Sequence, residues 1–180
     1  LVDTITNQFS QLRKELAALE NKTVVNMVAA RIEAADELIN TIASAIDDCI
    51  KTFSSTNIQH ESELDGAYDL FRQFEHLFSR YVEVLNVVAD GAWADLPDMQ
   101  AFLAMHRGQL QQSKERIVTF QPGVLFFKIH LSTLDTILAR LKAEGVNSWF
   151  EAIKAFWGEK KPQSINEQAA AFYEMMFYMM

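Results

Sequence analysis

The sequence is poor in cysteine and in the residues that break helices. Its 180 residues include one cysteine, three prolines and six glycines. So few breakers favour long helices, because proline removes a backbone donor and glycine loses most entropy on folding. A lone cysteine, Cys49, cannot form an internal disulfide, which excludes a disulfide-stapled secreted scaffold and favours a cytoplasmic location. We expect Cys49 to be a buried packing residue.

A signal peptide and a membrane-spanning run are also lacking. The longest suspicious stretch, residues 117–127, is interrupted by Gln121, Pro122 and Gly123. It is far shorter than the ~20 apolar residues that a spanning helix needs. The chain begins without methionine and stops at Met180 inside an apolar run, so we expect an excised domain or a processed product.

Basic charge is scarce in the first half of the chain. Residues 1–90 carry 7 Lys and Arg against 15 Asp and Glu, whereas residues 91–180 carry 9 of each. The net charge of −8 repels phosphate backbones, so we expect no nucleic-acid partner. The acidic half is interpreted as a solvated face, with docking of a basic partner as the functional alternative.

What the sequence does contain is a heptad-like spacing of apolar residues. From Val25 to Phe53 they recur at alternating gaps of three and four, which places them on one helix face. Similar spacing elsewhere predicts an all-α fold, an elongated bundle of about five long and two short helices in a single domain, 1–180. The predicted helices cover residues 2–20, 23–53, 61–89, 97–119, 123–143, 148–157 and 164–180.

Several helix ends carry recognisable signals. The apolar register slips at residues 21–23, so the chain either turns there or continues through a stutter, and we favour the turn. Pro97 suits the first turn of a helix, and Gly145 suits a left-handed stop. Capping boxes predict two further helix starts, at Ser148 with Glu151 and at Ser164 with Glu167.

No motif for catalysis or metal binding was found. A metal site within one helix needs a carboxylate or second imidazole about one turn from a histidine. The positions three and four before and four after each of the four histidines hold neither. Phosphate-binding glycine loops and nucleophile elbows are absent too. We therefore assign no catalytic residue and predict no resident metal or cofactor.

His106 and His130 lie on or beside apolar seams. Satisfied core histidines are the expected reading. The alternative is a ligand-sensing bundle, in which these two side chains bind an apolar or planar cofactor near the phenylalanine-rich third helix.

The last helix is the most informative region for function. Eight of the nine residues 172–180 are apolar, and they cover nearly its whole circumference. A bundle edge buries one face of a helix, so we expect the remainder to contact another chain, either a second copy or the rest of a longer protein. The alternative is a helix inserted among the long helices. The predicted partner-binding residues are Tyr173, Met176, Phe177 and Met180.

These observations favour a non-catalytic protein-interaction or scaffold bundle. A ligand-sensing bundle is the alternative, and a membrane-acting helical protein is third. We expect a protein partner or self-association through the C-terminal helix.

The seam of the second helix generates a first prediction. Ile39 lies in mid-seam, so Ile39→Ala should lower the free energy of unfolding by ~2–5 kcal/mol, through lost burial and the cavity left behind. Chemical denaturation measures this change. A loss below ~0.5 kcal/mol would mean that the seam faces solvent.

Overall fold

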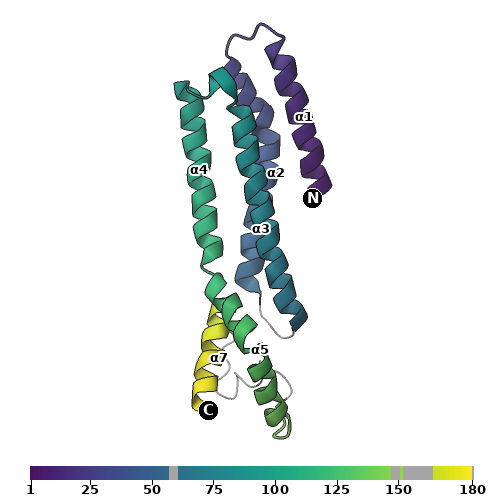
Figure 1. The fold of residues 1–180 in the computed structure, drawn as a ribbon, viewed down its shortest axis with the longest axis vertical. Helices are drawn as coiled ribbons and strands as arrows, with labels where there is room; N and C mark the ends of the chain where they lie inside the picture. The colour runs from purple at the N-terminus through teal and green to yellow at the C-terminus, as the bar shows by residue number, and fades with distance from the viewer. Residues whose placement is uncertain (57–60, 147–150, 152–163, 180) are drawn as a thin grey trace. The chain divides into compact units, whose positions relative to one another are not determined.

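The computed structural model describes residues 1–56, 61–146, 151 and 164–179. Over these residues the fold is all-α, as predicted. The elements are α1 (Val2–Glu20), α2 (Met27–Ser55), α3 (Glu61–Val88), the 3-10 turn η1 (Gly91–Trp93), α4 (Pro97–Val118), α5 (Gln121–Lys142) and α7 (Ile165–Met179) (Figure 1). The predicted helix 148–157 lies almost entirely outside the described residues.

The start of α2 corrects one expectation. The chain does turn after α1, but α2 begins at Met27 instead of residue 23. The physical reason is Asn26, whose Oδ1 accepts a hydrogen bond of 3.0 Å from the Ala29 N–H and so caps the helix. Val25 lies before this cap and is fully exposed, so its assignment to the buried seam is wrong.

Other helix ends follow the sequence signals. Ser164 Oγ accepts a hydrogen bond of 3.2 Å from the Glu167 N–H at the start of α7. After α5, Gly145 has a φ of +89°, and the Val146 N–H donates to the Leu141 carbonyl at 3.1 Å. This left-handed stop is the predicted one. Pro97 is the first residue of α4, and α5 begins two residues earlier than predicted.

The described chain forms two compact units, each treated separately below. Unit 1 comprises residues 1–48 and 73–114, and unit 2 comprises residues 49–72 and 115–180. Helices α2, α3 and α4 are divided between the two. The single domain expected from chain length stays a prediction.

In unit 1, α1 and α4 lie on opposite sides of the α2 and α3 pair (Figure 1). An ion pair of 3.6 Å joins Arg13 of α1 to Glu83 of α3. Across the unit, the hydroxyl of Tyr81 in α3 hydrogen-bonds His106 of α4. The core between these helices contains the fully buried side chains of Leu12, Leu38, Ile42, Leu77, Leu85 and Met99.

The buried face of α2 is wider than the predicted seam. Seam residues such as Ile39 and Ile46 are buried, but so are Leu38 and Ala45, which lie beside them. Positions beside the seam are therefore buried as well, because α2 packs against neighbours on more than one side. The buried residues of α2 that lie off the seam are Arg31, Leu38, Ala45 and Ile50.

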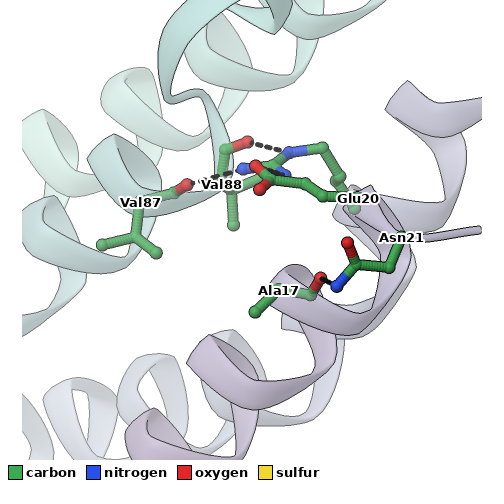
Figure 2. Close-up of polar contacts among 6 residues, drawn as sticks. Ala17, Glu20, Asn21, Val87 and Val88 are labelled. Carbon is green, nitrogen blue, oxygen red and sulfur yellow. Dashed lines mark hydrogen bonds and ion pairs between the residues drawn. The ribbon is translucent and has the colours of Figure 1, made fainter.

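Arg31 is 2% exposed, which is unusual for a charged side chain. Its Nε donates to the Val88 carbonyl at 2.9 Å and its Nη2 to the Val87 carbonyl at 3.0 Å (Figure 2). Its Nη1 lies 3.8 Å from the carboxylate of Glu20. Val88 is the last residue of α3, so the guanidinium meets the negative end of a helix and satisfies carbonyls that lack intrahelical partners.

We predict that Arg31→Met destabilises the chain. The thioether fills part of the volume but leaves the Val87 and Val88 carbonyls buried without these donors, at an expected cost of ~2–3 kcal/mol. Urea denaturation of this variant beside Arg107→Met, at an exposed arginine of α4, measures the difference. Equal stabilities of the two variants would show that the buried guanidinium contributes nothing.

Candidate functional site

In unit 2, the C-terminal helix α7 packs against α5 (Figure 1). Phe172 is fully buried and meets the buried ring of Phe127 edge to face, with ring centroids 5.9 Å apart. The next residue, Tyr173, meets Phe126 in the same manner at 6.4 Å. Two consecutive aromatic pairs therefore join the helices, one inside the unit and one nearer its surface.

The predicted partner-binding residues have different surroundings. Tyr173 is 63% exposed, whereas Met176 is buried and contributes to the packing of unit 2. The side chain of Phe177, and all of Met180, lie outside the described part of the structure. Tyr173 is thus the described member of the four that faces solvent. The helix combines a face built into the unit with a face left open.

Asn166, in the first turn of α7, bonds to both sides of the junction between α4 and α5. Its Oδ1 accepts a hydrogen bond of 3.2 Å from the Gly123 N–H, and its Nδ2 donates to the Thr119 carbonyl. Both backbone groups belong to helix ends, where intrahelical partners are missing. A Cβ at position 123 would lie 2.5 Å from that Oδ1 and 3.1 Å from the Ile165 carbonyl oxygen. Glycine is therefore what allows α7 to approach the junction.

A groove of about 440 Å³, open to solvent, lies between α5 and α7. Small residues leave it hollow, and the rings of Phe126 and Tyr173 are its aromatic lining. Glu174 is the charged residue of this lining. The full lining is Pro122, Gly123, Phe126, Asn166, Ala169, Ala170, Tyr173 and Glu174.

Two large apolar side chains of α5 extend this surface. Leu125 is 55% exposed and Ile129 is 62% exposed. They are one turn apart. At about 100° per residue Ile129 lies about 20° around α5 from Pro122, and Leu125 lies about 60° from it, further from Phe126. We call the groove lining together with Leu125 and Ile129 the α5/α7 surface.

The sequence analysis missed Leu125 and Ile129. The available signal was their position, because both are large apolar residues that lie off the predicted seam through Val124 and Phe127.

On another side of α5 lies a polar groove of about 790 Å³, shared with α3. There the Lys128 ammonium lies over the Tyr68 ring, 5.8 Å from its centroid. Burial, and then the charge of Asp65, raise the pKa of Tyr68, so its hydroxyl stays protonated at neutral pH. Lys128 therefore faces α3 and is not part of the α5/α7 surface.

His106 is a half-buried residue of unit 1. Its Nδ1 lies 2.6 Å from the Tyr81 hydroxyl, and its ring meets that of Phe102 edge to face at 4.5 Å. Burial raises the pKa of Tyr81 to about 12, so the hydroxyl is protonated at neutral pH and can donate to a neutral imidazole. Burial also lowers the pKa of His106, and the charge of Asp36 opposes that shift in part.

His130 belongs to unit 2 and contacts Phe126, with the two rings tilted by 42° and their centroids 4.8 Å apart. The structure therefore gives the two candidate cofactor ligands separate surroundings, one in each unit. Among the described residues, no group of three or more His, Cys, Asp or Glu side chains could hold a metal ion.

No single helix within the described ranges is long and apolar enough to cross a membrane, although one bent helix pair passes on length and composition alone. Comparison with protein-family models, with curated proteins and with solved structures finds no significant match to this chain.

The surroundings of His106 predict a pH dependence of stability. Because folding lowers the pKa of His106, the unfolded chain binds the proton more strongly than the folded chain does. The contribution of His106 to the free energy of unfolding is therefore lost as pH falls below about 6.5. His106→Gln should flatten the decline in unfolding free energy between neutral and mildly acidic pH, by at most about 1.4 kcal/mol per pH unit.

Denaturation series at several pH values test this, with His76→Gln at an exposed position of α3 as the control. An unchanged slope in His106→Gln would contradict the prediction.

Proposed function

We propose that this chain is a non-catalytic protein-interaction module that receives an apolar helix of a partner protein on its α5/α7 surface. The observation that carries the proposal is the open groove between α5 and α7, in which the lining residue Tyr173 is 63% exposed. Leu125 and Ile129 add exposed apolar side chains further around α5. Exposed apolar side chains gathered at a groove mark interaction sites.

The shape of the groove supports a helix as its occupant. From Asn166 to Tyr173, α7 rises about 10 Å, which matches three anchoring side chains on successive turns of a docked helix. Gly123, Ala169 and Ala170 leave room for one large apolar side chain. Tyr173 and Phe126 offer rings on either helix, and tyrosine is enriched among residues that dominate binding energies.

The surface is also held in place by the interior of unit 2. Phe172 and Met176 are buried on the neighbouring face of α7, and Asn166 fixes the start of the helix. A surface that is ordered before binding loses less conformational entropy when a partner arrives. This rigidity favours a scaffold role over a role in which α7 folds only on binding.

A helical probe peptide tests the proposal. A peptide of about 18 residues, five turns, with leucine on one face and glutamine on the other, should bind the chain. Tyr173→Ala should weaken that binding about fivefold or more, the usual effect of truncating a central anchor. The thermal midpoint should barely move, because the side chain is mostly exposed.

Fluorescence anisotropy measures binding, and Met105→Ala is the matched control, because Met105 is a 54% exposed apolar residue of α4 in unit 1. A wild-type chain that does not bind the peptide, or an equal loss in the control variant, contradicts the proposed surface.

A further inference from the structure

The charged residue in the described lining of the groove is an acid. Glu174 is exposed and lines the groove. The sequence of α7, Ile165–Met179, contains no lysine or arginine. Lys128 is the cation of α5 nearest in sequence to the groove-lining Phe126, and it lies over the Tyr68 ring in the polar groove shared with α3. The apolar hollow thus has a carboxylate at its edge, and among the described residues no ion pair to Glu174 is found.

We infer that the occupant of this surface is a helix of a different protein, whose apolar face is bordered by lysine or arginine. The inference rests on the proposed function and specifies the partner's chemistry. An apolar side chain enters the hollow between Phe126 and Tyr173, and a neighbouring cation reaches Glu174. The Tyr173 ring gives the same cation a second favourable contact.

A second copy of this chain fits the surface poorly. Two copies related by a twofold axis present the same patch to each other, so each would bring Glu174, and no lysine or arginine of α7, to the contact. The net charge of −8 adds a general repulsion between copies. Complementary charge, by contrast, steers a basic partner toward the site and selects it over acidic alternatives.

Three peptides with the same leucine face test the inference, their polar face being glutamine, lysine or glutamate. The lysine peptide should bind best and the glutamate peptide worst. Glu174→Gln should weaken binding of the lysine peptide about threefold at low salt, a typical size for one exposed ion pair, and leave the glutamine peptide unaffected. Glu174→Lys should favour the glutamate peptide over the lysine peptide, relative to wild type.

Glu75→Gln, at an exposed position of unit 1, makes the same change in net charge and is the control for long-range attraction. If Glu75→Gln weakens the lysine peptide as much as Glu174→Gln does, the preference comes from net charge and the inference fails, while the interaction function stands. If the glutamine peptide does not bind either, the proposed function fails as well.

Sedimentation velocity of the chain alone completes the test. The inference predicts no dimer that depends on Tyr173. A dimer that Tyr173→Ala dissociates would assign the surface to a second copy and overturn the inference.

Discussion

The side-chain amide of Asn166 holds α7 against the junction of α4 and α5, and the open surface of unit 2 depends on that contact. The amide bonds to backbone groups on both sides of the junction, at Thr119 and Gly123. The rings of Phe172 and Phe127 pack edge to face in the interior of unit 2. Tyr173 faces outward because its neighbour Phe172 faces inward, since consecutive residues of a helix point about 100° apart. The way α7 packs against α5 thus determines both that Phe172 is buried and that Tyr173 is exposed.

The same arrangement explains why an apolar surface can persist without disturbing the fold. The buried face of α7 contributes Phe172 and Met176 to the core of unit 2, whereas the Tyr173 side chain is mostly outside it. A residue such as Tyr173 or Ile129 is therefore free of the packing constraints that act on the core. Leucine, isoleucine and tyrosine side chains left in water on two adjoining helices are costly to solubility, which argues that they are retained for a contact.

The sequence predicted the all-α class and most helix ends, because both depend on local rules. Ser164, Pro97 and Gly145 each act within one turn of their own position. The open surface was predicted only at Tyr173. The exposure of Leu125 and Ile129 was not predicted, because it depends on where neighbouring helices lie. Apolar periodicity alone does not specify those positions. The hydrogen bonding of Asn166 was not predicted for the same reason, since its partner Gly123 lies 43 positions earlier in the sequence.

Arg31 determines the register of the pairing between α2 and α3. Its guanidinium comes from the second turn of α2, and its carbonyl partners come from the last turn of α3, 57 positions away. If α3 slid along α2 by one turn, apolar side chains would still meet apolar side chains, because both helices repeat every three or four residues. The buried charge, however, would lose its carbonyls, and an unpaired buried cation is strongly unfavourable. A repetitive apolar interface is thereby limited to a single alignment.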